Sequence, residues 1–202
     1  MTEKQTLIQK ALRLEYLLIS YNLLEAAAAL AAGWKAQSIT LVGFGLDSVI
    51  EVASAGTLVW RMKQTGLDDE EHESESEKRA LLIVGITFFL LAGYVIYESI
   101  EKLRLRQPPD RSFWGILIAI LSLLFMPYLG LRKRKIAREI GSRALEADAM
   151  ETMICAWLSA IVLVGVGLNA CMGWWWADPA AGLVMSAFIV KEGWETFEES
   201  RE

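Results

Sequence analysis

Two acidic side chains stand one helical turn apart inside a long uncharged stretch of this sequence. Asp47 and Glu51 occur in the segment "FGLDSVIEV" (44–52), and Glu151 and Cys155 have the same spacing in a second apolar stretch. Positions i and i+4 share one face of a helix. Carboxylate oxygens and a thiolate are ligands of zinc and related divalent ions. Two such pairs on facing helices would therefore supply the four ligands of a tetrahedral metal site.

Three further polar residues lie in or beside the same stretches. Asn22 and Glu25 form an i, i+3 pair in the first stretch, and Asp148 precedes Glu151 by three residues. We expect them to be additional metal ligands or part of a proton pathway. The alternatives are an interhelical polar contact for Asn22 and Glu25, and a cap or hydrogen bond near the mouth of the site for Asp148. Cys155 has an alternative too, because free cysteines are often buried and inert.

Acids inside an apolar helix need compensation if that helix lies in a membrane. An ionised acid near the bilayer centre costs about 2.5–3.5 kcal/mol. The apolar stretches contain no Lys or Arg at a comparable depth, so we do not expect salt bridges to provide the compensation. Protonation, a water-filled cavity or a bound cation would, and each of these describes a cation or proton pathway. The alternative is that each acid is neutral and hydrogen-bonded to a neighbouring helix.

The elements that position these residues are long apolar segments. The chain has 202 residues and is 54% hydrophobic, with a mean hydropathy of +0.33. A helix that spans a bilayer needs about 20 mainly apolar residues. Six segments qualify, at about 14–33, 39–60, 80–100, 112–131, 149–170 and 177–193. The sequence therefore predicts an all-α membrane protein, with six transmembrane helices in a single domain over residues 1–202. Asp178 before Pro179 predicts the start of the last helix, with the acid as its N-cap.

Basic residues predict the orientation of these helices. With six spans both termini lie on one side, and that side holds fifteen of the twenty Lys and Arg residues, many of them in "LRKRKIAREIGSR" (131–143). The positive-inside rule then makes both termini cytoplasmic. We expect an integral protein of the inner (plasma) membrane, whose basic segment contacts anionic lipid headgroups.

The remaining motifs point away from other functions. The acidic segment "LDDEEHESESE" (67–77) contains Asp68, Asp69 and His72, which we interpret as a weak cytoplasmic metal site or, alternatively, as a solvated loop. The sequence contains no glycine-rich phosphate loop, no zinc motif of paired cysteines, no nucleophile–base pair and no base-reading basic stripe. We therefore expect neither an enzyme nor a nucleic-acid partner.

Three segments resemble the cation diffusion facilitator family. "GFGLDSVIEVASAGTLVW" resembles the family's second span, "ALEADAMETMICAWLSAIVLVG" its fifth, and "WWWADPAAGLVMSAFIVKEGWE" its sixth. The resemblance implies a homodimeric, proton-coupled exporter of zinc or a related metal, with a transport site at Asp47, Glu51, Glu151 and Cys155. Two departures stand out: many members have His and Asp where this chain has Glu151 and Cys155, and many continue into a C-terminal cytoplasmic domain. We therefore expect a short, transmembrane-only branch.

The expected mechanism is exchange of metal for protons by alternating access. If all four ligands were ionised, their charge would exceed that of a divalent ion, which favours protonation of the empty site. Two other functions remain open. One is a proton or cation channel that uses the same acids, and the other is a non-transporting membrane adaptor that binds metal for stability.

Overall fold

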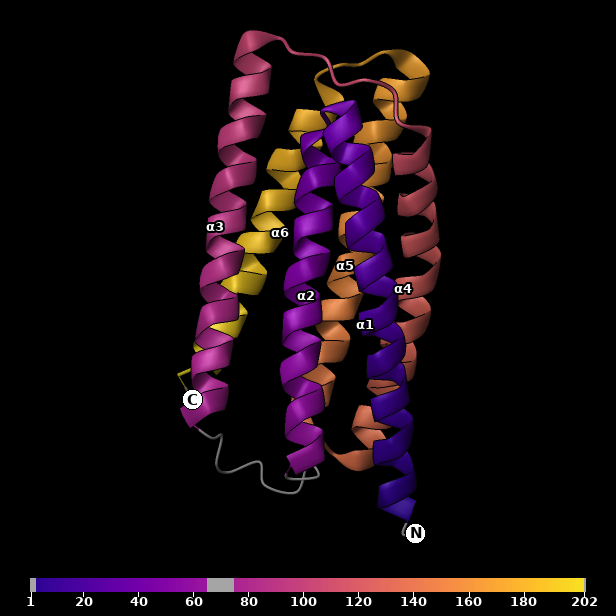
Figure 1. The fold of residues 1–202 in the computed structure, drawn as a ribbon, viewed down its shortest axis with the longest axis vertical. Helices are drawn as coiled ribbons and strands as arrows, with labels where there is room; N and C mark the ends of the chain where they lie inside the picture. The colour runs from indigo at the N-terminus through magenta and orange to yellow at the C-terminus, as the bar shows by residue number, and fades with distance from the viewer. Residues whose placement is uncertain (1–2, 65–74, 202) are drawn as a thin grey trace.

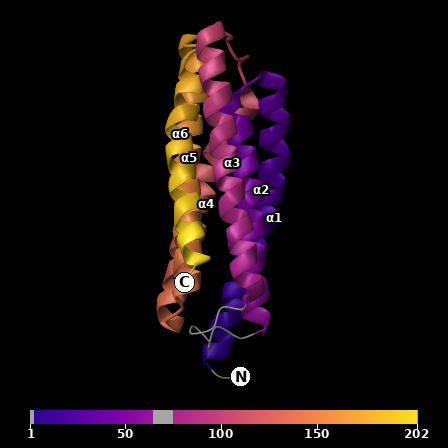
Figure 2. The ribbon, with the colours of Figure 1, turned by 90° about the vertical axis from the view of Figure 1, so that its left-hand side faces the viewer.

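Six α-helices make up the fold, as the sequence predicts. The computed structural model describes residues 3–64 and 75–201, and contains no strand in these ranges. The helices are α1 (Glu3–Ala36), α2 (Ile39–Gln64), α3 (Glu75–Leu105), α4 (Phe113–Ile140), α5 (Arg143–Met172) and α6 (Ala177–Glu199). They run side by side along one long axis (Figures 1 and 2). Both termini lie at one end of the bundle, which we call the terminal end, and we call the other the distal end.

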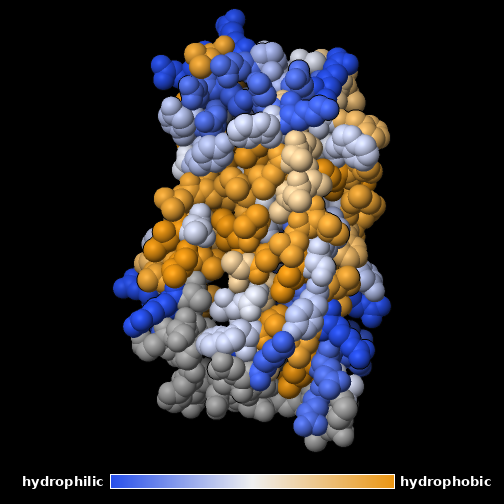
Figure 3. Space-filling model, viewed as in Figure 1, coloured by the Kyte–Doolittle hydropathy of each residue, from blue (hydrophilic) through white to orange (hydrophobic). Residues whose placement is uncertain are grey.

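Five of the helices in the described part of the chain, α1 to α5, are long and apolar enough to cross a membrane. The sixth, α6, has 23 residues and carries Lys191, Glu192 and Glu195 in its last third, which lowers its apolar character. It packs lengthwise against α3 and also contacts α5 and α2. A broad apolar belt separates polar surfaces at the two ends of the bundle (Figure 3). These features confirm an all-α membrane protein.

Several helices extend beyond the apolar segments that predict them. Helix α1 starts at Glu3, about three turns before the predicted span. Its first turns carry an apolar stripe, including Ala11, that packs against Met62, Ile136 and Leu145 at the terminal end. Hydropathy marks only the part of a helix that the membrane requires. The extension instead depends on packing against residues distant in the sequence.

Helix α2 lies at the centre of the bundle. It contacts α1, α3, α5 and α6, and it is the most buried of the five membrane-spanning candidates. The close approach of α1 to α2 depends on Gly33, because a Cβ there would lie 2.8 Å from the backbone nitrogen of Val42. An acid on α2 therefore faces protein on most sides rather than lipid.

Asp178 does not cap its own helix, contrary to the prediction. Helix α6 begins one residue earlier, and the Asp178 carboxylate accepts hydrogen bonds from the backbone N–H of Ile39 (2.9 Å) and from the hydroxyls of Ser38 and Thr40. It thus satisfies a donor at the start of α2, where the helix dipole favours negative charge. The acid joins the distal ends of α2 and α6.

Candidate metal centre

The predicted α2 pair is buried inside the bundle. Asp47 and Glu51 have 3% and 6% of their surface exposed. Oδ1 of Asp47 and both carboxylate oxygens of Glu51 have no hydrogen-bond partner among the described residues. A buried polar atom without a partner costs on the order of 1–3 kcal/mol, and more when it is charged. The fold therefore holds these oxygens where only a proton, a water molecule or a cation can compensate them.

The predicted α5 pair faces the α2 pair. Glu151 is half-buried, and the Ser54 hydroxyl of α2 donates a 3.0 Å hydrogen bond to its Oε2. Cys155 is 1% exposed and lies within electrostatic range of Asp47 and Glu51. Asp47 likewise lies within electrostatic range of Glu151. The structure thus brings all four predicted residues to the contact between α2 and α5.

These four residues share a neighbourhood without forming a closed coordination shell. Among residues 3–64 and 75–201, no three His, Cys, Asp or Glu side chains converge closely enough to hold one ion in this conformation. Binding a metal there would require side chains of α2 and α5 to change rotamer or the two helices to approach.

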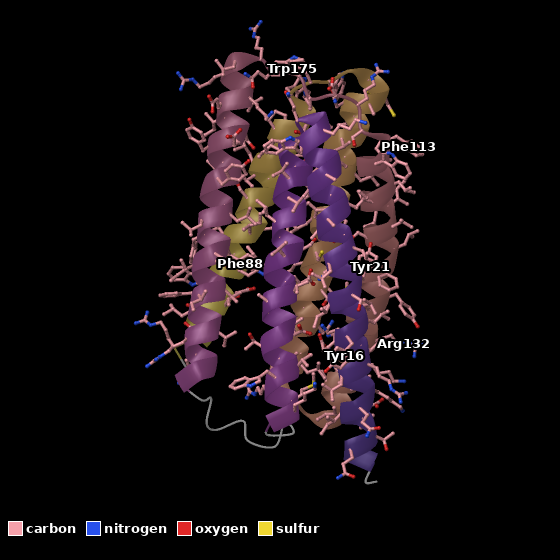
Figure 4. The ribbon with its side chains drawn as sticks, viewed as in Figure 1. Tyr16, Tyr21, Phe88, Phe113, Arg132 and Trp175 are labelled. Atoms are coloured by element: carbon pink, nitrogen blue, oxygen red, sulfur yellow. The ribbon has the colours of Figure 1, made fainter. Side chains whose placement is uncertain are left out.

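Helix α1 adds an acid to the same region. Oε1 of Glu25 accepts a 2.9 Å hydrogen bond from the Ser48 hydroxyl of α2, while its Oε2 has no partner among the described residues. The Tyr21 hydroxyl, at mid-height in Figure 4, is a further neighbour of this carboxylate. Asn22 is fully buried, and its amide atoms also lack partners within the described ranges. The interhelical contact proposed as the alternative for Glu25 is therefore present, and Glu25 still repels Asp47.

Sequence comparison assigns this architecture to a family. Residues 16–202 match the cation efflux transmembrane domain, which covers α2 to α6 and the larger part of α1. The chain belongs to this cation efflux family. The resemblance to cation diffusion facilitators that the sequence motifs indicate is thereby confirmed, and the family consists of transporters rather than enzymes.

Individual relatives of this cation efflux domain have diverse names. This chain is 25% identical to Transmembrane protein 163 of Xenopus laevis, over 95% of this chain and 67% of the relative. It is 24% identical to the cation-efflux pump FieF of Salmonella typhi, over 79% of this chain and 54% of the pump. It is also 24% identical to a cadmium, cobalt and zinc/H(+)-K(+) antiporter of Bacillus velezensis, over 95% of this chain and 61% of the antiporter. The chain spans about half to two thirds of the length of these relatives.

The expectation that no Lys or Arg lies at the depth of the buried acids is wrong. A buried cation, Lys133, lies close to the site. Lys133 of α4 is 0% exposed, and its Nζ is 3.0 Å from both carboxylate oxygens of Glu15. It also forms an ion pair with Asp148 and donates a 3.3 Å hydrogen bond to the Thr152 hydroxyl. Its neighbour Arg132, by contrast, projects outward from α4 (Figure 4).

The Lys133 cluster changes the interpretation of Asp148. Its carboxylate is occupied by Lys133, at the junction of α1, α4 and α5. The hydrogen-bonded role that was the alternative for Asp148 fits this geometry better than a metal ligand does. Glu51 lies within electrostatic range of both Lys133 and Asp148, so the Lys133 cluster adjoins the site on its terminal side.

An acid that the sequence motifs do not reveal, Glu192, faces the site from α6. Glu192 is 5% exposed, its Oε2 has no hydrogen-bond partner in the described part of the chain, and it lines a cavity together with Glu151. Glu192 lies near the end of the last predicted span, next to Lys191. At such a position the sequence alone predicts a charged side chain that is exposed to solvent. Its i+4 neighbour Thr196 is the one local sign of a buried polar stripe.

The predicted weak loop site lies outside the described residues. Asp68, Asp69 and His72 all fall within residues 65–74. The candidate centre is composed of helical residues of α2 and α5, with Glu25 of α1 and Glu192 of α6 beside it.

Proposed function

We propose that this chain exports zinc or a chemically similar divalent cation across the membrane in exchange for protons. The transported ion would bind to Asp47, Glu51, Glu151 and Cys155. The observation that carries the proposal is the set of buried carboxylate oxygens of Asp47 and Glu51, which lack hydrogen-bond partners in the described ranges and face Glu151 and Cys155 across the α2–α5 contact. Family membership supports transport as the activity.

Ligand chemistry supports a borderline-soft metal as the substrate. Three carboxylates would suit many divalent ions, whereas the Cys155 thiolate favours zinc, cadmium and similar ions over magnesium or calcium. A relative named as a cadmium, cobalt and zinc antiporter supports the same class of substrate. We therefore place zinc first, with other thiophilic divalent ions as further substrates.

Charge balance supports protons as the counter-ions. Without metal, Asp47, Glu51 and Glu25 face one another with Lys133 as a neighbouring cation already shared by Glu15 and Asp148. Like charges in a low-dielectric interior favour the protonated acids, and an arriving dication would displace those protons. Alternating access of one site to the two sides of the membrane would then exchange metal for protons.

The basic residues support the orientation. The terminal end carries the cluster around residues 131–143, so we place this end and both termini in the cytoplasm of a plasma-membrane protein. Metal would load from the terminal end and leave at the distal end. We further propose a homodimer, as the family resemblance implies, held together through the membrane-spanning helices.

Proton release on metal binding tests this proposal. Zinc added to the purified protein in weakly buffered detergent solution should acidify it, and the acidification should depend on pH. Asp47→Asn should lose both binding and proton release. Glu146→Gln should retain them, because Glu146 is a partly exposed acid on α5 that pairs with Arg134 and Arg138. Zinc binding that Asp47→Asn leaves intact would refute the site, and binding without any proton release would refute the exchange.

A further inference from the structure

A cavity between α5 and α6 opens near the terminal end of the bundle. Its volume is about 340 Å³, and the charged residues that line it are Glu151 of α5 with Lys191, Glu192 and Glu195 of α6. Lys191 is engaged by Glu195 at 3.0 Å. The wall of this cavity is thus rich in carboxylates and leads to Glu151, a residue of the candidate metal centre.

Glu151 also lines a second cavity, between α2, α3 and α5, but that cavity suits a cation less well. Its volume is about 40 Å³, and the basic residue Arg61 is part of its lining. Its other acid, Asp148, is held by Lys133. Because a cation is drawn to accessible negative charge, the α5–α6 cavity is the better path to the centre.

Glu192 occupies the decisive position in the α5–α6 cavity. It is nine-tenths buried, it lines the cavity, and its Oε2 finds no donor among the described residues. The nearby Thr196 hydroxyl donates to the backbone oxygen of Glu192 and leaves the carboxylate uncompensated. Glu151 lines the same cavity, so the Glu192 carboxylate lies beside a residue of the candidate metal centre.

We propose that Glu192 and Glu151 form a relay site that binds the incoming divalent cation in the α5–α6 cavity before the cation reaches the buried centre. This inference rests on the proposed function. Two carboxylates and water supply only oxygen ligands, so the relay site binds divalent ions with little discrimination between them. Glu151 belongs to both sites and transfers the ion inward, where Cys155 adds the sulfur ligand. Glu192 thus contributes an α6 ligand to a transport path otherwise built from α2 and α5.

Transport kinetics of the full chain test the relay site. Zinc flux into proteoliposomes is measured against zinc concentration for the wild type, Glu192→Gln, Glu192→Asp and Glu198→Gln. Glu198 is a matched control because it is exposed on the same helix. Loss of a residue that only supports a metal ligand typically costs about 10–100-fold in affinity, so loss of the ligand Glu192 in Glu192→Gln should raise the KM for zinc at least about tenfold. Its kcat should change less than about twofold, because the binding that is lost contributes equally to the bound ground state and to the transition state of transport. Glu192→Asp should restore most of the affinity, and Glu198→Gln should match the wild type.

The outcomes separate the relay site from the proposed function. An unchanged KM in Glu192→Gln, together with abolished flux in Asp47→Asn, overturns the relay site alone. Flux that survives in Asp47→Asn overturns the buried centre, and with it the relay site that supplies the centre. If Glu192→Gln does not fold, carbodiimide labelling of the wild-type protein provides the answer by mass spectrometry. Zinc should protect Glu192 from labelling, and equal labelling with and without zinc would overturn the inference.

Discussion

Replacing Lys133 by methionine should destabilise the whole bundle. The lysine Nζ is fully buried and forms ion pairs with both Glu15 and Asp148, which belong to α1 and α5. Methionine fills a similar volume, but it leaves two carboxylates in each other's field without a cation. Removing one partner of a buried ion pair costs about 3–5 kcal/mol, because the remaining charge stays desolvated. For a chain of this size such a loss corresponds to a fall of roughly 6–20 °C in Tm.

Thermal unfolding in detergent, followed by circular dichroism, measures this effect. Lys135→Met is the matched control, because this lysine is on the same helix, its side chain is 74% exposed and it only approaches Glu139 at 3.9 Å. The control should change stability by less than about 0.5 kcal/mol. Combining Lys133→Met with Glu15→Gln and Asp148→Asn removes the stranded charges and should recover most of the stability. A Tm for Lys133→Met equal to that of the control would refute the electrostatic account of this cluster.

Three further predictions concern capping, packing and metal preference. Asp178→Ala should destabilise the fold by about 1–2 kcal/mol, because the start of α2 loses its acceptor; an unchanged Tm would contradict this role. Gly165→Ala should destabilise by about 1–3 kcal/mol, since the new Cβ would lie 2.7 Å from Cβ of Ala181 on α6. Gly167→Ala, with nothing within 4 Å of its Cβ, should instead stabilise by about 0.5–1 kcal/mol; equal Tm shifts would argue against close α5–α6 packing. Cys155→Ser should lower the ratio of cadmium to zinc flux about tenfold, equivalent to about 1.4 kcal/mol, and an unchanged ratio would exclude the sulfur as a ligand.

Periodicity and hydropathy are sufficient to predict the six helices. The i, i+4 spacing also places Asp47 and Glu51 on one face of their helix, and Glu151 and Cys155 on one face of theirs. That the two faces belong to one site is what the family resemblance implies. The structure brings these four residues into one region and adds Glu25 through its bond to Ser48.

Residues at the ends of the helices are harder to predict. Lys133 lies among five other basic residues at the end of an apolar segment, and nothing local distinguishes it from its exposed neighbours. Its partner Glu15 is 118 positions away in the sequence, so its burial follows from the packing of α1 against α4. Asp178 caps a helix that starts 139 residues earlier, again through tertiary contact. Glu192 becomes visible as a site residue only once α6 is placed beside α5.

Zinc transport under a pH gradient tests the central claim most directly. Proteoliposomes that contain the wild-type chain, Asp47→Asn, Glu151→Gln or the control Glu146→Gln are loaded with a zinc indicator and a pH indicator, and both signals are followed after zinc is added. We predict zinc uptake with opposite proton movement in the wild type and the control, and loss of both signals in the two site variants. Unchanged zinc flux in Asp47→Asn and Glu151→Gln would contradict the assignment of these acids as the transport site.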